Sequence, residues 1–200
     1  MKSTSIRRRP FLRMTGLVGL ATAAGGITSA AEIAPELHIE GYAGEVSYPQ
    51  GAELALHVSS SQRRYSLEIT RIGAQRTVVR QGTAETGAIQ PIPANASSHG
   101  CGWPVGLRVP IAANWKSGYY QVQFRVEDHG GDYVRRTHRV ADSSCFFIVR
   151  AAQPGGDSKI LLQFSTNTYN AYNNWGGFSL YAFNGRGGNQ GHRVSFQRPP

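Results

Sequence analysis

Apolar and polar side chains alternate with a period of two over most of residues 37–150. The clearest cases are residues 54–58, 65–69 and 120–126, where every second side chain is apolar. A β-strand turns successive side chains to opposite faces, so this alternation is typical of strands with one buried and one solvated face. Turn-forming residues rich in glycine separate the segments at 49–51, 72–73, 116–118 and 129–132. The sequence therefore predicts a mainly β protein built on an antiparallel, immunoglobulin-like β-sandwich.

Residues 146–149 are apolar throughout, which predicts the last strand of the sandwich in a central position. Residues 152–158 follow, and their proline, paired glycines and polar side chains predict a linker. We therefore divide the chain into a sandwich domain at 32–151, the linker at 152–158 and a second unit at 159–200.

The second unit opens with an apolar run at 160–164, which predicts a strand covered on both faces, as in parallel sheets. Ser165 or Thr166 is suited to cap a following helix. We expect this strand and helix to begin an incomplete α/β domain that continues beyond Pro200, because one strand in about 40 residues seldom buries enough surface to fold alone.

Polar and aromatic residues follow the predicted strand at its carboxyl end, where open α/β sheets bind ligands. These candidate site residues are Asn167, Tyr169, Asn170, Tyr172, Asn173, Asn174 and Trp175. Amide side chains both donate and accept hydrogen bonds, and a deprotonated tyrosine is a hard oxygen ligand for ferric iron. The alternative is a loop-packing network in which asparagines cap turns and the aromatic rings fill an interface.

Residues 1–31 have the layout of an export signal. A twin-arginine pair at Arg8 and Arg9 precedes a weakly apolar run, and small residues lie near Ala31. The alternative, a transmembrane anchor, is disfavoured because the run is short and diluted by glycine and threonine. We expect export by the twin-arginine route to the periplasm or beyond, with no membrane association after cleavage.

Loss of this signal changes the charge of the protein. It carries five basic and no acidic residues, so the formal net charge falls from +9 to +4. The remaining arginines are scattered among the strands and form no tract interleaved with aromatic residues. We therefore expect no nucleic-acid partner.

The two cysteines, Cys101 and Cys145, predict one disulfide bond in an exported protein. Two separate buried thiols are the alternative. No paired cysteine or histidine spacing predicts a zinc site, and the six histidines are dispersed along the chain. His57 lies on a predicted strand, where we expect it to face solvent.

Residues 160–181 read ILLQFSTNTYNAYNNWGGFSLY, and residues 193–199 read RVSFQRP. Both segments resemble the large (β) subunit of N,N-dimethylformamidase and its relatives, which carry a similar TNTxxAYNxWGGxSLY…RVSFxRP signature. The sandwich region is similar more loosely, at 40–51, 58–60, 65–73, 101–104 and 115–120.

The resemblance implies hydrolysis of the C–N bond of a formamide or other small amide by a mononuclear non-haem iron. In that family two tyrosines and a glutamate hold the iron, which polarises the amide carbonyl and activates water. Tyr172 is the best match to a ligand, with Tyr169 as a near rival, and we expect the remaining ligands beyond Pro200.

Three hypotheses follow from the sequence. The first is an exported dimethylformamidase-like protein that is truncated and inactive alone, and that needs its missing C-terminal portion or an oligomer. The second is an exported β-sandwich that binds a polymer or a protein without catalysis. The third is the remnant of a frameshifted gene.

Overall fold

The computed structural model describes residues 36–130, 137–156 and 159–200. The predicted export signal lies outside the described residues, as does part of the predicted turn at 129–132. Among the described residues, no helix is both long and apolar enough to cross a membrane.

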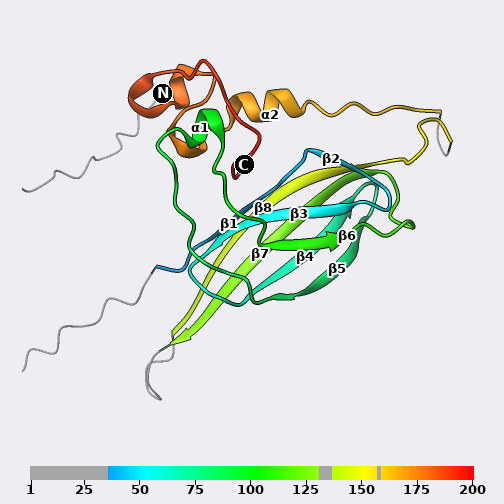
Figure 1. Cartoon of the computed structure of the whole chain (residues 1–200), viewed down its shortest axis with the longest axis horizontal. Helices are drawn as coiled ribbons and strands as arrows, with labels where there is room; N and C mark the ends of the chain where they lie inside the picture. Colours follow the sequence, from blue (N-terminus) through cyan, green and yellow to red (C-terminus); the bar gives the residue numbers. More distant parts are fainter. Residues whose placement is uncertain (1–35, 131–136, 157–158) are drawn as a thin grey trace, which may run out of the picture. The chain divides into compact units, whose positions relative to one another are not determined.

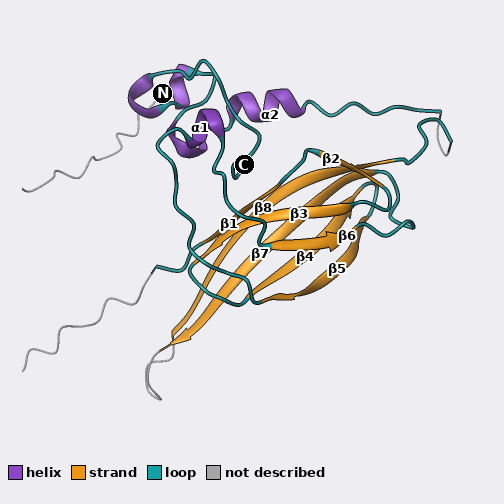
Figure 2. Cartoon of the chain, in the orientation of Figure 1, coloured by secondary structure: helices purple, strands orange, loops and turns teal. Residues whose placement is uncertain are grey.

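Two sheets make up the first part of the described chain (Figures 1 and 2). The smaller has the order β1-β3-β6, with β1 at Ile39–Ala43, β3 at Glu53–Ser60 and β6 at Leu107–Pro110. The larger has the order β2-β8-β7-β4-β5. Its strands are β2 (Ser47–Pro49), β4 (Tyr65–Ile72), β5 (Arg76–Ala84), β7 (Gly118–Gly130) and β8 (Thr137–Arg150). All pairs are antiparallel except β2 with β8, so the larger sheet is mixed.

The core of the sandwich consists of the alternating apolar residues that the sequence singles out. β3 contributes Leu54, Leu56 and Val58 from the smaller sheet, and each is at most 2% exposed. The larger sheet contributes apolar residues from β4, β7 and β8 to the same cluster. Burial of apolar surface at about 25 cal/mol per Å² makes this cluster the main source of stability. The predicted sandwich is confirmed.

The two sheets approach closely where β1 crosses β7. A Cβ atom added to Gly41 in β1 would lie 2.7 Å from Cε2 of Phe124 in β7. Phe124 is fully buried, so its ring has no free space into which it could move. Glycine at position 41 leaves the space that the Phe124 ring occupies.

Strand β8 has a neighbour on each side, β2 and β7, which confirms the central position predicted from its apolar residues. Cys145, Phe147 and Val149 face the core and are buried, whereas Phe146 and Ile148 between them are partly buried. Phe146 stacks on Tyr119 with ring centroids 5.2 Å apart. This second face of β8 lies against the tail of the chain.

The predicted strand at 160–164 is not present. No strand is assigned to these residues, and Ile160, Leu161 and Leu162 are 84%, 92% and 72% exposed. A strand needs a partner for its backbone hydrogen bonds, and the described residues offer this run no neighbouring strand. An apolar composition alone does not make a strand, so this prediction was wrong.

Helix α2 (Thr166–Tyr172) follows, with Ser165 at its N-cap position, where the Ser165 side chain makes no capping hydrogen bond. Three 3₁₀ turns lie beyond it: η1 (Trp175–Gly177), η2 (Ala182–Asn184) and η3 (Arg186–Gly188). Another short helix, α1 (Ala96–His99), belongs to the long connection between β5 and β6.

The tail packs on this connection. The Cys101 amide donates to the Gln197 carbonyl at 2.8 Å, and the Ser195 amide donates to the Ser97 carbonyl at 2.9 Å. In Figure 1, α1, α2 and the C-terminus accordingly gather on the same side of the sheets. By their contacts, the tail and the sandwich belong to the same compact unit among the described residues.

Candidate functional site

A cavity of about 400 Å³ lies between the tail and the sandwich. One wall comes from α2 and the C-terminal residues, including Phe196 and Pro200. The other comes from β1, the β1–β2 connection, β7 and β8. The lining is mainly apolar and aromatic with a few polar groups, which is the usual character of a small-molecule site.

Four of the seven candidate site residues line this cavity: Tyr169, Asn170, Tyr172 and Asn173. Asn167, Asn174 and Trp175 do not. The cavity also takes residues from the sandwich that the sequence analysis did not identify as site residues. These are Tyr42, Ala43, Glu45, Val46, Tyr119, Ser144, Cys145 and Phe146. Only the docking of the tail on the sandwich brings these two sets together.

Asn170 is the polar residue best placed to meet a ligand. It is 7% exposed and lines the cavity. Its side-chain amide makes no hydrogen bond within the part of the chain that the structure describes, whereas its backbone carbonyl accepts one from Arg198. The amide is open to the cavity, because Ser143 Oγ is the one side-chain N or O atom of the described residues that is both buried and without a partner. The Asn170 amide is therefore free to bond a polar group of a ligand.

Asn173 and Asn174 instead hold the local structure together. The Asn173 side chain donates to the Pro199 carbonyl at 2.8 Å and accepts from the Trp175 amide at 2.9 Å. Asn174 donates to the Asn184 carbonyl at 3.0 Å. For these two residues, the structure supports the loop-packing alternative.

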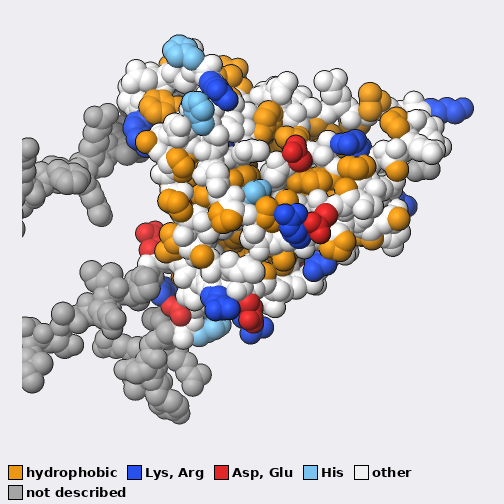
Figure 3. All heavy atoms as spheres, in the orientation of Figure 1, with side chains coloured by type: hydrophobic (Ala, Val, Ile, Leu, Met, Phe, Trp, Pro, Cys, Tyr) orange, Lys and Arg blue, Asp and Glu red, His pale blue; other side chains and the backbone are white. Residues whose placement is uncertain are grey.

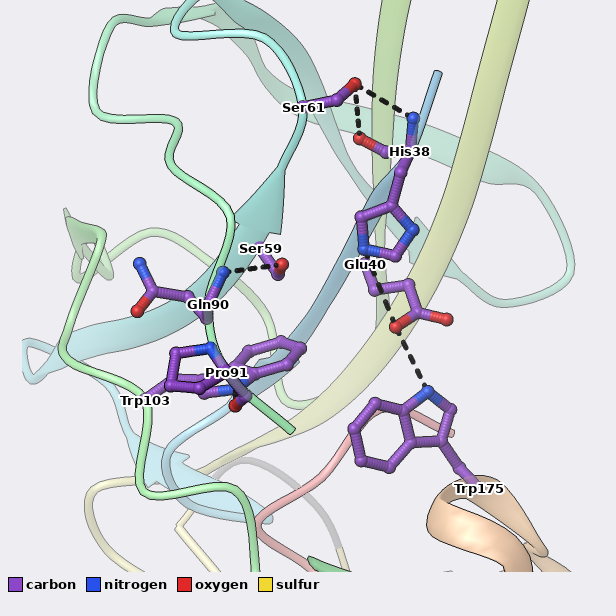
Figure 4. A network of polar contacts seen from close by, with 8 residues as sticks. All are labelled: His38, Glu40, Ser59, Ser61, Gln90, Pro91, Trp103 and Trp175. Carbon is purple, nitrogen blue, oxygen red and sulfur yellow. Dashed lines mark hydrogen bonds and ion pairs between the residues drawn. The ribbon is translucent and has the colours of Figure 1, made fainter. Parts of the chain in front are cut away.

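Trp175 connects the tail to the first strand of the sandwich (Figure 4). Its indole Nε1 donates to Oε2 of Glu40 at 3.1 Å, and its ring meets Trp103 edge to face at 5.8 Å. Trp103 in turn donates from its indole nitrogen to the Pro91 carbonyl at 2.8 Å. The last contact anchors the loop at 101–104 through the indole of Trp103.

Arg198 fixes the wall that α2 contributes. It is 2% exposed, and its guanidinium donates to five backbone carbonyls, those of Asn170, Asn173, Trp175, Phe178 and Ser195. The carbonyls of Asn170 and Asn173 lie at the C-terminal end of α2, where helical carbonyls lack partners and a cation is favourable. A guanidinium has five N–H groups, so Arg198 has none left for a ligand. Its role in the site is to position α2.

The tyrosines of the sandwich wall are held in the neutral form. Burial, followed by the nearby Cys101 thiol, raises the pKa of Tyr42 to about 12. Burial is also the main cause that raises the pKa of Tyr119. At neutral pH these two phenols can donate hydrogen bonds, but they do not supply phenolate oxygens.

Tyr172, the candidate iron ligand, packs against other tail residues. Its ring stacks on Tyr181 with centroids 4.1 Å apart, and Phe183 lies 6.3 Å away. The hydrogen bond with Tyr172 raises the pKa of Tyr181. Tyr172 is 46% exposed and Tyr169 is 64% exposed, so both phenols reach solvent.

The donors around this cavity do not make a complete iron site. A mononuclear iron held by protein needs several anionic or imidazole ligands on one ion. The lining offers one carboxylate, Glu45, and tyrosines of which the buried ones resist deprotonation. Among the described residues, the one group of three His, Cys, Asp or Glu side chains with ligand atoms in reach of one another lies elsewhere, at Glu127, His129 and His138.

The predicted disulfide is absent, because Cys101 and Cys145 are both free and buried. They belong to different apolar clusters: Cys101 packs with Tyr42, Ala96 and Trp103, whereas Cys145 lies in the sandwich core. Burial raises the pKa of each thiol to about 12. The alternative of two separate buried thiols is therefore correct.

The sequence predicted that His57 faces solvent, and this prediction is only partly right. Its ring is partly buried and stacks on Tyr42 with centroids 4.7 Å apart. Nδ1 of His57 lies 2.6 Å from the Trp103 carbonyl oxygen. The sequence predicted that His57 lies on the outer face of β3, but it could not show that the loop with Trp103 covers this face.

Comparison with known families supports the motif in the tail. The family model "N,N-dimethylformamidase beta subunit-like, C-terminal" matches residues 66–200, about two thirds of the chain. The chain belongs to the N,N-dimethylformamidase β-subunit-like family. No curated protein matches the chain. The matched region of this dimethylformamidase-like chain includes β7, β8 and all of the tail, and hence one wall of the cavity and part of the other. The residues that β1 and the β1–β2 connection contribute to the cavity lie outside it.

Proposed function

We propose that this exported dimethylformamidase-like chain binds a small amide, of the formamide class, in the cavity between α2 and the sandwich. The observation that carries the proposal is the Asn170 side-chain amide, which opens into the cavity and has no partner in the described chain, although the residue is only 7% exposed. The family match supports the choice of an amide as the ligand.

The chemistry of the cavity suits such a ligand. A tertiary formamide has one strong acceptor, its carbonyl oxygen, and no N–H donor. The Asn170 NH₂ group donates to that oxygen, and the methyl groups of the ligand pack against the aromatic lining, such as Phe146 and Phe196. A hydrogen bond of this kind contributes about 0.5–1.5 kcal/mol to binding.

The family activity that the resemblance implies is iron-dependent hydrolysis of the amide C–N bond. The described residues provide Tyr172 as a candidate ligand but no complete ligand set around it. We therefore propose that residues 1–200 form one wall of the hydrolytic site and bind the amide, and that they do not hydrolyse it alone.

Two assays on the full chain test these statements. Saturation-transfer NMR measures N,N-dimethylformamide binding to the wild type, to Asn170→Ala and to Asn167→Ala, an exposed position on the same helix. We expect Asn170→Ala to weaken binding roughly three- to tenfold, as the loss of one hydrogen bond implies, and Asn167→Ala to bind as the wild type does.

The second assay measures release of dimethylamine after addition of ferrous or ferric iron, and we expect no more than the rate without protein. Iron-dependent hydrolysis at an enzymatic rate would refute the statement that the chain does not catalyse alone. Absence of saturable amide binding would refute the proposed function, and would favour a sandwich that binds a polymer or a protein.

A further inference from the structure

The β7–β8 hairpin brings together two side chains of β7 and one of β8. Glu127 and His129 are two residues apart on β7, so their side chains lie on the same face of the sheet. His138 on β8 is the direct cross-strand partner of His129. Sequence analysis found dispersed histidines because the strand register, and not the sequence spacing, makes them neighbours.

One carboxylate oxygen faces both imidazoles. Oε2 of Glu127 lies 3.3 Å from Nε2 of His138 and 3.6 Å from Nε2 of His129. All three ligand atoms lie within 4.8 Å of one another. Two ligand atoms on a tetrahedral zinc ion, each about 2.0–2.2 Å from the metal, are roughly 3.3–3.5 Å apart. The two observed separations are close to this spacing.

The carboxylate is already held in a suitable orientation. Nε of Arg125 donates to the other oxygen of Glu127, Oε1, at 2.5 Å. This hydrogen bond leaves Oε2 for the histidines, as outer partners of metal ligands commonly do. The positive charge of Arg125 opposes a cation nearby, so it lowers the affinity of the site.

The imidazole rings have room to adjust. They stack with centroids 4.5 Å apart and an interplanar angle of 4°, and coordination of one ion requires both rings to turn toward it. The side chains of His129 and His138 are 73% and 50% exposed, so core packing does not fix their rotamers. Figure 3 shows histidine, acidic and basic side chains next to one another at the surface near this end of the sheet.

We propose that Glu127, His129 and His138 form a surface site for a borderline divalent cation, of which Zn²⁺ is the type. Two imidazole nitrogens and one carboxylate oxygen are ligands that zinc prefers, whereas Ca²⁺ and Mg²⁺ take oxygen ligands alone. Three protein ligands leave the fourth tetrahedral position to water. None of the three residues lines the amide cavity, so this site is independent of the proposed function.

Zinc titration of the full chain, prepared without a polyhistidine tag, tests the site. Isothermal titration calorimetry should detect one equivalent of Zn²⁺. Glu127→Gln, His129→Ala and His138→Ala should each weaken binding at least about tenfold. His192→Ala removes an exposed histidine of the tail and should leave binding unchanged.

Co²⁺ gives a second readout that does not depend on heat signals. A four-coordinate Co²⁺ complex has an intense visible absorption, and we expect it in the wild type and in His192→Ala but not in the double variant His129→Ala/His138→Ala. Circular dichroism checks that the variants are folded. No zinc binding by the wild type, or full binding by the double variant, would overturn the proposal.

Discussion

Replacement of Arg198 should release the tail from the sandwich while the sandwich stays folded. Arg198→Met keeps most of the apolar stem of the side chain and removes the guanidinium. Five backbone carbonyls then lose their donor, two of them at the end of α2. None of these carbonyls belongs to a sandwich strand, so the loss falls on the tail.

The size of the effect follows from the kind of interaction that is lost. A hydrogen bond from a charged group contributes about 1.5–3 kcal/mol, but contributions to five carbonyls are not additive. A buried carbonyl that loses its donor costs about 1–3 kcal/mol, so a total of about 3 kcal/mol is a conservative figure for the tail. A local loss of about 3 kcal/mol corresponds to roughly 150-fold faster amide exchange, since 1.4 kcal/mol is a factor of about ten.

Hydrogen–deuterium exchange with mass spectrometry measures this change segment by segment. We expect peptides of residues 166–178 to exchange about 150-fold faster in Arg198→Met, with little change in β4 and β7. Arg198→Lys keeps the charge with three donors and should give an intermediate effect. Arg193→Met, an exposed arginine of the same tail, is the control. Wild-type exchange of the tail in Arg198→Met would refute this role of Arg198.

Three further predictions concern other parts of the chain. Gly41→Val should lower the free energy of unfolding by about 1–3 kcal/mol in urea denaturation, because the new side chain overpacks against Phe124. Gly82→Ala is the control, because a Cβ added at Gly82 meets nothing within 4 Å and should cause no overpacking. Equal losses of stability in the two variants would contradict this. Burial raises the pKa of Cys145 from 9.0 to about 12, so as the pH rises the unfolded chain loses the thiol proton before the folded chain does. The stability that the protonated thiol gives is therefore complete below pH 9 and declines as the pH rises toward 12. Between pH 8 and pH 10 the wild type should therefore lose about 1.4 kcal/mol more than Cys145→Ser in urea unfolding, and parallel pH profiles would contradict the burial argument. Replacement of both Arg8 and Arg9 by lysine should stop export in cell fractionation, and unchanged export would show that the twin-arginine route is not used.

The sandwich was predictable because its information is local. Alternation at Leu54, Leu56 and Val58 records which face of β3 is buried, and the same holds for β4 and β7. The prediction of a strand at 160–164 was wrong because a strand also needs information that is not local. A strand depends on a neighbouring strand, and five apolar residues do not say whether one is present.

The candidate site was predictable only in part. The tail motif gave Tyr169, Asn170, Tyr172 and Asn173, four residues of one cavity wall. The opposite wall, and the role of Arg198, depend on contacts between distant segments that no local pattern records. The disulfide predicted between Cys101 and Cys145 likewise depended on the distance between them in the fold, which sequence spacing does not give.

The most direct test of the central claim is to locate the amide on the chain. Titration of ¹⁵N-labelled full chain with N,N-dimethylformamide reports on side-chain amides as well as on the backbone. We predict saturable shifts of the Asn170 side-chain NH₂ and of backbone amides along β1, β8 and α2, and none at Gln81, on β5 away from the cavity. An unshifted Asn170 side chain at saturation, or shifts confined to another region, would contradict the account.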